Sequence, residues 1–442
     1  MSNLYDLLLL NGKVMTGENI NPDQLDLGIV DDKIVSIGNL KSKKAREEIN
    51  CQGLVILPGI IDTQVHFREP GYTHKETIEA GSKSAVLGGI TGFCEMPNTK
   101  PLTVSSYELE KKLSIAKNSS WCDYAFFIGA TSKNYEQLSM LESSPGCAGV
   151  KIFMGSSTGD LLVDDDKILR KILQNGSRRI AIHAEDEKRL KTRYEIYSKH
   201  KNVKIHPMIR DELSSLIATK RIVSISQEVN RKIHILHVST SREMKYLSKF
   251  KNLVTLEVTP QHLTLASPDC YSELGSLSQM NPPIRSIYHK RALWKAIDSG
   301  LVDVIGSDHA PHTLMEKKVS YPETPSGMPG VQTMVPIMLD HFSRKKITLS
   351  KIVDLLSTGP ARIYKMIGRG KIKKGYKASL TIVDINLEKS LEKKEIKSLC
   401  GWSPFENKNL KGWPVITIIN GSIAMKYGEL VSRPKVQEIK YF

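Results

Sequence analysis

Four side chains of the kind that bind divalent metals stand at the ends of short apolar runs. His66, His183 and His237 end the first, fifth and sixth of these runs, and Asp308 follows the eighth. Imidazole and carboxylate groups are ordinary zinc ligands, although a single histidine is more often a surface or core residue. If the runs are strands of one barrel, all four side chains meet at its carboxyl-terminal mouth. The pattern therefore predicts a metal site.

A lysine lies inside the fourth apolar run. Lys151 stands in the sequence Gly-Val-Lys-Ile-Phe-Met at 149–154, which has the composition of a buried strand. Burial of an unpaired ammonium is costly and lowers the pKa of lysine, which favours the neutral amine. A neutral amine can add carbon dioxide to form a carbamate, an anion able to bridge two metals. The other interpretation is a lysine whose charged end reaches solvent at the strand edge, and the residues alone leave both open.

The elements that must hold these side chains alternate between strands and helices. The apolar runs lie at 59–66, 92–96, 124–129, 149–154, 179–183, 232–238, 253–258 and 302–307. Helices are predicted between them at 75–87, 107–117, 165–173, 212–228, 242–250 and 290–299, two of them with capping boxes, Thr73 with Glu76 and Thr240 with Glu243. Eight strand–helix alternations predict an α/β protein with a (β/α)8 TIM-type barrel. A doubly wound sheet is the alternative by count, but it does not explain the polar strand ends.

Both ends of the chain have the pattern of short strands. Residues 1–57 contain the apolar stretch 7–10 and expected turns at Asn11-Gly12 and Asp31-Asp32, and residues 371–442 contain strands at 379–384 and 415–419 with a turn at Asn420-Gly421. We predict one small β-sandwich domain built from 1–57 and 371–442, beside a barrel domain at 58–370. The alternative is two unrelated additions to the barrel.

Composition excludes several other classes of protein. The chain has 442 residues, and its net charge of +16 comes from 63 Lys and Arg against 47 Asp and Glu. The lysines are spread out and accompany no nucleic-acid motif, so no nucleic-acid partner is expected, whereas an anionic small substrate fits. No apolar run is long enough to cross a bilayer, and the start does not have a signal-peptide pattern. Six scattered cysteines without a C-x-x-C pair indicate reduced thiols in a cytoplasmic protein.

The motifs around these residues resemble a known family. Residues 58–71, from Pro-Gly-Ile-Ile-Asp to His-Phe-Arg-Glu-Pro-Gly, resemble the first-strand signature of dihydroorotases, metal-dependent barrels of the amidohydrolase superfamily. The resemblance continues in order through Met96-Pro97-Asn98-Thr99, His183-Ala184-Glu185-Asp186, His237-Val238-Ser239-Thr240, Asn281-Pro282-Pro283-Ile284-Arg285, Asp308-His309-Ala310-Pro311-His312, Ser403-Pro404-Phe405 and Gly412. It covers nearly the whole chain. Lys151 resembles the carboxylated bridging lysine of the hydantoinase-like branch.

The resemblance implies a role for each metal-binding side chain. His66 and Asp308 would hold the more buried metal, His183 and His237 the other, and the carbamate of Lys151 would bridge them. Zinc (Zn2+), as one or two ions, suits the imidazole-rich set, and manganese or cobalt remain open. A metal-bound water would be the nucleophile, with Asp308 as general base and then acid.

The resemblance also implies a substrate. In dihydroorotases, residues matching Arg68, Asn98 and His312 hold the substrate carboxylate, for which an Arg fork is well shaped. Asn281 would bind the pyrimidine ring, and backbone near Ser326-Gly327 would close over it. Hydantoinases and allantoinases act on rings without that carboxylate and lack the set.

One position departs from the family pattern. The first strand normally carries His-x-His, but here Gln64 stands at the first position, on the same face as His66. A carboxamide oxygen is a poorer zinc ligand than imidazole. Three outcomes follow: a weakly bound buried metal, a single metal on Lys151, His183 and His237, or a non-catalytic protein. Gln261, where a His-His pair is common, touches no assigned ligand.

We therefore expect a cytoplasmic, metal-dependent dihydroorotase that interconverts N-carbamoyl-L-aspartate and dihydroorotate in pyrimidine synthesis. The first rival is another cyclic amidohydrolase, for hydantoin or allantoin. The second is a non-catalytic subunit that partners aspartate transcarbamoylase. The resemblance implies a homodimer, and His234, His262, His309 and His341 are expected to be structural.

Overall fold

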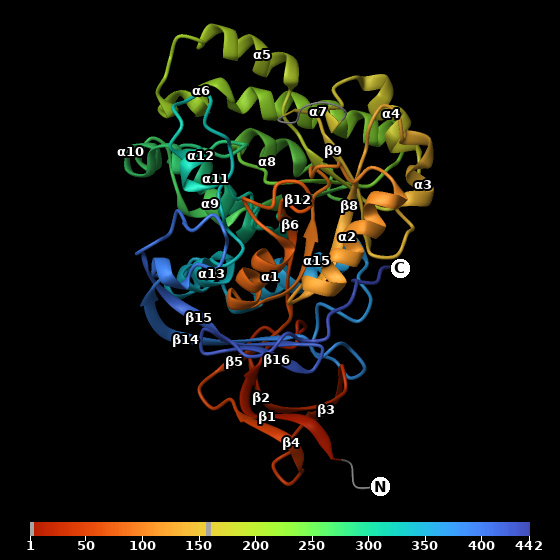
Figure 1. The fold of residues 1–442 in the computed structure, drawn as a ribbon, viewed down its shortest axis with the longest axis vertical. Helices are drawn as coiled ribbons and strands as arrows, with labels where there is room; N and C mark the ends of the chain where they lie inside the picture. Colours follow the sequence, from red (N-terminus) through yellow and green to blue (C-terminus); the bar gives the residue numbers. More distant parts are fainter. Residues whose placement is uncertain (1–3, 156–160) are drawn as a thin grey trace.

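The computed structural model describes residues 4–155 and 161–442 and contains two β-sheets. One is an eight-stranded sheet surrounded by helices, and the other is a nine-stranded sheet built from the two ends of the chain. Figure 1 shows the second sheet below the first, with its red N-terminal strands beside its blue C-terminal ones.

The eight-stranded sheet is parallel, and its strands follow one another in chain order. They are β6 (Ile60–Val65), β7 (Ile90–Glu95), β8 (Asp123–Gly129), β9 (Cys147–Phe153), β10 (Ile180–His183), β11 (Ile233–Ile235), β12 (Val254–Val258) and β13 (Val304–Ile305). A bridge between Val65 and His309 links the segment after β13 back to β6, so the barrel is nearly closed. Every strand is buried throughout, as expected when both faces of a parallel sheet are covered. The predicted barrel is confirmed.

Helices fill the connections between the barrel strands and continue beyond the last one. They are α1 (Ile78–Leu87), α2 (Ser106–Ser119), α3 (Leu138–Leu141), α4 (Asp166–Gln174), α5 (Glu187–Ile196), α6 (His206–Ile209), α7 (Glu212–Glu228), α8 (Ser241–Leu247), α9 (Pro260–Thr264), α10 (Asp269–Leu274), α11 (Ile287–Asp298), α12 (Leu314–Lys317), α13 (Met334–Ser343), α14 (Leu349–Val353) and α15 (Gly359–Tyr364). All six predicted helices are present. Local sequence explains several starts, because residues such as Asp165 before α4 accept hydrogen bonds from the first free backbone N–H groups.

One predicted cap is correct and the other is wrong. Thr240 caps α8 and accepts a hydrogen bond from the backbone of Glu243. Thr73 does not cap α1, which begins later; its cap is Thr77, whose hydroxyl accepts from the backbone of Ala80 at 3.1 Å. Glu76, the expected partner of Thr73, is fully buried and bonds to groups far away in the sequence.

The nine-stranded sheet joins the two ends of the chain, as predicted. Its strands are β1 (Tyr5–Val14), β2 (Asp23–Val30), β3 (Lys33–Gly38), β4 (Ala45–Asn50), β5 (Val55–Pro58), β14 (Leu380–Ser390), β15 (Asn409–Ile419), β16 (Ser422–Lys426) and β17 (Glu429–Leu430). The junction is the pairing of β5 with β14. The turns at Asp31-Asp32 and Asn420-Gly421 are confirmed. The turn at Asn11-Gly12 is wrong: the pair lies within β1, at an irregularity in its pairing with β2.

The final residues leave this sheet and pass beneath the barrel. Glu438 bridges to Tyr124 of β8, and Ile439 is buried among residues of the barrel interior such as Phe127 and Tyr364. The domain boundaries at 57 and 370 therefore stay a prediction. In the described part of the chain, no helix is both long and apolar enough to cross a membrane. All six cysteines are buried free thiols.

Candidate active site

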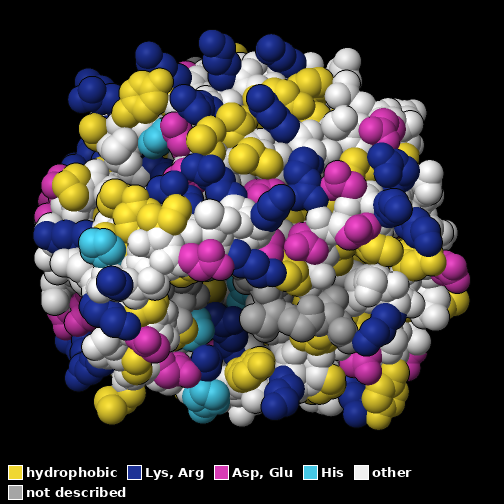
Figure 2. All heavy atoms as spheres, turned by 90° about the horizontal axis from the view of Figure 1, so that it is seen from above, with side chains coloured by type: hydrophobic (Ala, Val, Ile, Leu, Met, Phe, Trp, Pro, Cys, Tyr) yellow, Lys and Arg dark blue, Asp and Glu magenta, His cyan; other side chains and the backbone are white. Residues whose placement is uncertain are grey.

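Every residue predicted to belong to the site lines one pocket, a cavity of about 210 Å³. These residues are Gln64, His66, Arg68, Asn98, Lys151, His183, His237, Asn281, Asp308, His312 and Gly327. Phe153, Ala310 and Ser326 also line it. Figure 2, a view from above, shows a hollow in which histidine and Lys or Arg side chains are visible. The barrel topology thus brings together side chains from distant parts of the sequence.

Three of these residues have a left-handed backbone. The φ angles of Arg68, His237 and Asp308 are 64°, 36° and 45°. Each follows the end of a barrel strand (β6, β11 and β13), so the chain turns sharply where it leaves the sheet. Such angles are strained for residues other than glycine, and strain of this kind concentrates at functional sites.

The first group of side chains consists of His66, Asp308 and Gln64. His66 Nδ1 lies 2.7 Å from Asn98 Oδ1, which only accepts, so Nδ1 carries the proton and Nε2 presents a lone pair. Burial lowers the pKa of His66, which favours this neutral form. Nε2 lies 3.3 Å from Asp308 Oδ1. Two electron-rich atoms this close fit a cation placed against both.

Gln64 takes part in this group through its amide nitrogen. Gln64 Nε2 donates to Asp308 Oδ1 at 2.9 Å, and Gln64 Oε1 is buried without a hydrogen-bond partner. In this orientation Gln64 holds the Asp308 carboxylate and offers its own oxygen to the pocket.

The second group consists of His183 and His237, which point at each other. His183 Nδ1 lies 3.0 Å from His237 Nε2. The other nitrogen of His183 lies 2.9 Å from a carboxylate oxygen of Glu185, which only accepts a hydrogen bond. His183 Nδ1 therefore carries the lone pair, and Glu185 fixes the tautomer in the way that partners of metal-bound histidines do.

The carboxylate of Glu185 is itself held from behind. Arg210 Nη2 lies 2.6 Å from Glu185 Oε2, and both side chains are buried. Despite burial, Arg210 and His183 keep the pKa of Glu185 well below its usual range, so it stays ionised. The sequence analysis missed both roles. The only sequence signal for Glu185 is its place two residues after His183, just beyond the end of β10.

Lys151 is 1 % exposed, and its amine has no hydrogen-bond partner. Burial lowers its pKa to about 7, so a large fraction of the amine is neutral at physiological pH. The interpretation of a lysine reaching solvent at the strand edge is therefore wrong. A buried amine with a lowered pKa is what carbamate formation requires.

These donors fit a metal only as a combined set. Within residues 4–155 and 161–442, no group of three or more His, Cys, Asp or Glu side chains is arranged to hold a metal ion by itself. The predicted ligands instead form a histidine–carboxylate pair and a histidine pair. Lys151, whose buried amine lines the same pocket, would supply the additional ligand once it carries a carbamate.

Other residues of the pocket could contact a substrate. Arg68 Nε donates to Pro311 O at 3.1 Å, and burial lowers the pKa of Arg68 to about 10, which still leaves it charged at neutral pH. Asn281 Oδ1 lies 3.0 Å from His206 Nε2, which orients the amide. Gly327 has a φ of 142°, and a Cβ there would lie 2.4 Å from Ala310 O, so no larger residue fits.

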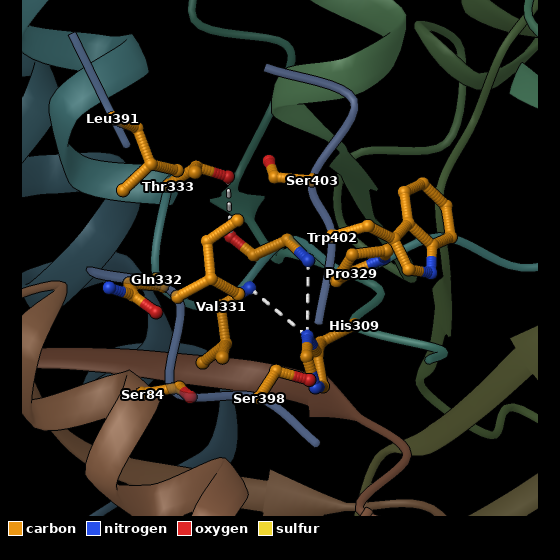
Figure 3. Close-up of a pocket in the computed structure, with 12 residues that line it drawn as sticks. Ser84, His309, Pro329, Val331, Gln332, Thr333, Leu391, Ser398, Trp402 and Ser403 are labelled. Carbon is orange, nitrogen blue, oxygen red and sulfur yellow. Dashed lines mark hydrogen bonds between the residues drawn. The ribbon is translucent and has the colours of Figure 1, made fainter. Parts of the chain in front are cut away.

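His309 is the one histidine of the expected structural set that holds the site together. It is buried, its Nδ1 accepts from the backbone of Gly330 at 3.1 Å, and its carbonyl accepts from the backbone of His66 at 2.8 Å. Figure 3 shows its ring beside Ser398, with the bonds to the 330–331 backbone dashed. Glu76 lies 3.4 Å from its Nε2 and bonds to Ser398. The sequence assigned no such role to Glu76.

The other three histidines lie outside the pocket and have local partners. His234 Nδ1 is 2.8 Å from Thr255, His262 Nδ1 is 2.8 Å from Thr259, and His341 Nε2 is 2.9 Å from Thr264. Gln261 also lies outside it and donates to Ser307 O at 2.8 Å. These contacts are consistent with structural roles.

Comparison with known proteins points in the same direction. The model of the amidohydrolase family matches residues 55–424. A dihydroorotase of Pyrococcus furiosus is 35 % identical over 419 residues, covering 93 % of this chain and 92 % of that one. A dihydroorotase of Methanosarcina mazei is 33 % identical, covering 97 % of this chain and 96 % of its own.

Solved structures show the same fold. An L-hydantoinase from Arthrobacter aurescens superposes with a TM-score of 0.93 at 24 % identity, covering 99 % of this chain and 100 % of that one. A dihydropyrimidinase from Brevibacillus agri superposes with a TM-score of 0.90 at 22 % identity, covering 97 % of both chains.

Proposed function

The chain belongs to the amidohydrolase family, and we infer from its relatives and its pocket that it is a dihydroorotase, a hydrolase of cyclic amide bonds. The reaction is the interconversion of N-carbamoyl-L-aspartate with (S)-dihydroorotate and water, a step of de novo pyrimidine (UMP) synthesis. The observation that carries this proposal is the charged Arg68 in the same pocket as the two histidine groups and Lys151. An arginine fork there suits a substrate that bears a carboxylate beside its cyclic amide.

We propose that His66 and Asp308 would hold one divalent ion and that His183 and His237 would hold another, with Lys151, once it carries a carbamate, as a further ligand. Such ions, zinc above all, supply Lewis acidity, which lowers the pKa of a water molecule and polarises a carbonyl. Gln64 stands where the family normally has the first histidine of its His-x-His motif. The ion on His66 and Asp308 is therefore expected to bind more weakly than the ion on His183 and His237.

The chain's own residues would orient the substrate and move the proton. Arg68, Asn98 and His312 bind the carboxylate, and the amide of Asn281 binds the ring. In the hydrolytic direction water adds to the ring carbonyl, Asp308 accepts a proton, and it returns that proton to the ring nitrogen as the C–N bond breaks. Ring closure reverses these steps and releases water.

The nearest alternative is another cyclic amidohydrolase. The hydantoinase structures are similar in fold, but at 22 to 24 % identity they support nothing finer. Arg68 favours the carboxylate-bearing ring, because a buried cation without an anionic ligand would stay unpaired on that wall of the pocket. A non-catalytic subunit that partners aspartate transcarbamoylase is the second alternative, and it predicts no bound metal.

We further propose a cytoplasmic homodimer. The buried free cysteines suit a reducing compartment. The homodimer, and any contact with aspartate transcarbamoylase, rest on the family resemblance alone.

The proposal is tested by measuring metal per chain and ring closure of carbamoyl aspartate on the same sample, purified without chelators. One or two metals per chain with turnover would support a dihydroorotase. The number of metals would show whether a chain with Gln64 still binds the second ion. Absence of both, after zinc and bicarbonate are supplied, would favour the non-catalytic subunit.

A further inference from the structure

Three polar atoms lie within hydrogen-bond distance of the His312 imidazole and cannot all bond to it, while a fourth, Glu316 Oε2, lies farther away, 3.9 Å from Nδ1. Lys75 Nζ lies 3.1 Å from His312 Nδ1. On the other side, Arg68 Nη2 lies 3.1 Å and Ser326 O lies 3.2 Å from His312 Nε2. Lysine and arginine only donate hydrogen bonds, and a carbonyl only accepts them.

One tautomer of the neutral ring satisfies two of these three neighbours. Burial, followed by the charges of Arg68, Lys75 and Lys317, lowers the pKa of His312, so the ring is neutral. Nδ1 must then accept from Lys75, and Nε2 must donate to the carbonyl of Ser326. In the opposite tautomer Nε2 would accept from Arg68, but Nδ1–H would face the ammonium of Lys75 and Nε2 would face a carbonyl lone pair.

The first tautomer has a direct consequence for Arg68. Because Nε2 already carries a proton, the nearby Nη2 of Arg68 has no acceptor on His312, and its N–H groups remain for a ligand. His312 Nε2–H, which donates to the Ser326 carbonyl, is then a second N–H at the same wall that a carboxylate can share. A carboxylate entering here meets N–H groups of both Arg68 and His312, whereas the other tautomer would present it with a lone pair on His312 and with an arginine bonded to that ring.

We propose that Lys75 is a positioning residue for substrate specificity: by donating to His312 Nδ1, it makes His312 a donor toward the substrate carboxylate and leaves Arg68 free to bind that carboxylate. The inference rests on the proposed dihydroorotase function. Lys75 contacts the imidazole from its far side, so it acts through His312 and Arg68.

Lys75 is well placed for this role. Its side chain is 15 % exposed and lies 2.9 Å from Glu316 Oε1. Glu316 is fixed in turn by a capping box with Thr313 at the start of α12. His312 is anchored at its carbonyl, which accepts from Trp402 Nε1 at 2.8 Å. The donor and the ring are thus both held, and the tautomer is set without a contribution from the substrate.

The first test is kinetic. Lys75→Met keeps the aliphatic stem and removes the donor. It should raise KM for carbamoyl aspartate about 10- to 100-fold, the range expected for the loss of charge-assisted hydrogen bonds. The value of kcat should change by less than about threefold. Lys75→Arg restores a charged donor and should recover most of the affinity. The matched control is Lys83→Met, which removes a lysine bonded to Glu79 on the surface of α1 and should change neither constant.

The second test observes the tautomer itself. In wild-type protein labelled with ¹⁵N-histidine, the His312 signals, identified with His312→Asn, should be those of a neutral ring protonated at Nε2. Lys75→Met should shift them toward a mixture of tautomers, and Lys75→Arg should not.

The outcomes separate this inference from the proposed function. An unchanged KM in Lys75→Met, or Nδ1 protonation in the wild type, overturns the role of Lys75 even if the enzyme closes carbamoyl aspartate. If wild-type protein with bound metal does not turn over this substrate, the proposed function fails, while the ¹⁵N signals still decide the tautomer. If Lys75→Met does not fold, the wild-type and Lys75→Arg spectra decide it.

Discussion

The pocket wall and the terminal sheet use the same unusual backbone conformation in different ways. In the terminal sheet, left-handed φ angles occur at three Asn or Asp residues, Asn11, Asp31 and Asn420 (60°, 52° and 48°), and at Tyr427 (50°) in the exposed turn between β16 and β17. Asn and Asp tolerate this region better than other residues, so the conformation costs little there. At the pocket it occurs at the half-buried Arg68 and at two buried residues, His237 and Asp308, the aspartate proposed to transfer the proton. The sheet uses left-handed residues to shape the backbone, whereas the pocket uses them to aim side chains.

Buried polar atoms without a hydrogen-bond partner also distinguish the pocket region from the terminal sheet. Within the described residues, every buried side-chain polar atom without a hydrogen-bond partner lies between positions 62 and 364. Several line the pocket or its walls, including Gln64 Oε1, Lys151 Nζ and His237 Nδ1. Such atoms cost about 1–3 kcal/mol each when nothing satisfies them. The buried polar side chains of the terminal sheet are satisfied and favour stability, whereas those at the barrel mouth lower stability and remain available to bind a ligand.

The largest effect is expected at Lys151. Lys151→Met keeps the stem and removes the amine, so bound metal and activity should fall by about 1,000-fold or more, because several kcal/mol of transition-state stabilisation depend on the metals. The free energy of unfolding of the metal-free protein should stay constant or rise, since the amine that is lost is desolvated and has no hydrogen-bond partner, only the ring of Phe153 at 4.5 Å. Metal analysis and ring-closure rates measure the loss of metal and activity, and denaturant unfolding measures the stability of the metal-free protein.

Lys112 is the matched control for this change. It is another fully buried lysine, but it pairs with Glu95 at 2.8 Å. Lys112→Met should destabilise by about 3–5 kcal/mol, because the carboxylate is left buried and unpaired. If Lys151→Met is equally destabilised, or remains fully active, the bridging-carbamate proposal fails.

The terminal sheet should respond in the opposite way. Leu9 is completely buried in the core of that sheet, so Leu9→Ala should lower the free energy of unfolding by about 2–5 kcal/mol and leave kcat and KM unchanged. Leu387→Ala, at a position 36 % exposed on β14, should cost less than about 0.5 kcal/mol. A change of kcat in Leu9→Ala would show that the two regions are coupled.

Arg68 tests which ring the pocket recognises. Arg68→Ala should raise KM for carbamoyl aspartate and dihydroorotate about 100-fold, the loss expected for a bidentate arginine–carboxylate contact. Weak activity on uncharged rings such as hydantoin should not fall. A loss of equal size for both kinds of ring would favour the alternative cyclic amidohydrolase.

Glu185 tests the support behind the histidine pair. Glu185→Gln keeps the shape but allows the amide to orient either way, so the tautomer of His183 is no longer fixed. Metal affinity should fall about 10- to 100-fold, the usual effect of losing a carboxylate partner of a metal-bound histidine. Titration of metal-free protein with zinc measures this. An unchanged affinity would mean that His183 does not bind the metal through Nδ1.

The sequence predicted the strands and the pocket because both follow from topology. Parallel barrel strands carry their carboxyl ends to one mouth, so His66 and Asp308 meet there although they are far apart in the chain. What it missed depends on pairing between side chains. The roles of Lys75 and Glu185 follow from the particular atoms they face, and spacing along the chain does not give those.

Two errors have the same origin. Thr73 and Glu76 have the local pattern of a capping box, but Glu76 instead contacts His309 and Ser398, which are more than 200 residues away. Asn11-Gly12 has the local pattern of a turn, but β1 continues through it, because β2 and β5 pair with the strand beyond. In both cases tertiary partners that are invisible in a short window outweigh the local preference.

The smallest effect is expected where the left-handed backbone is cheap. Asp31 lies in the turn between β2 and β3, and its backbone N–H donates to Asp6 Oδ2 at 2.7 Å, a bond that any residue can make. In Asp31→Gly, relief of strain and the larger conformational entropy of the unfolded chain oppose each other, so unfolding free energy should change by less than about 0.5 kcal/mol. Denaturant unfolding measures this. A stabilisation above about 1 kcal/mol would mean that the sheet stores strain as the pocket does, and left-handed residues would then no longer distinguish the functional region from the structural one.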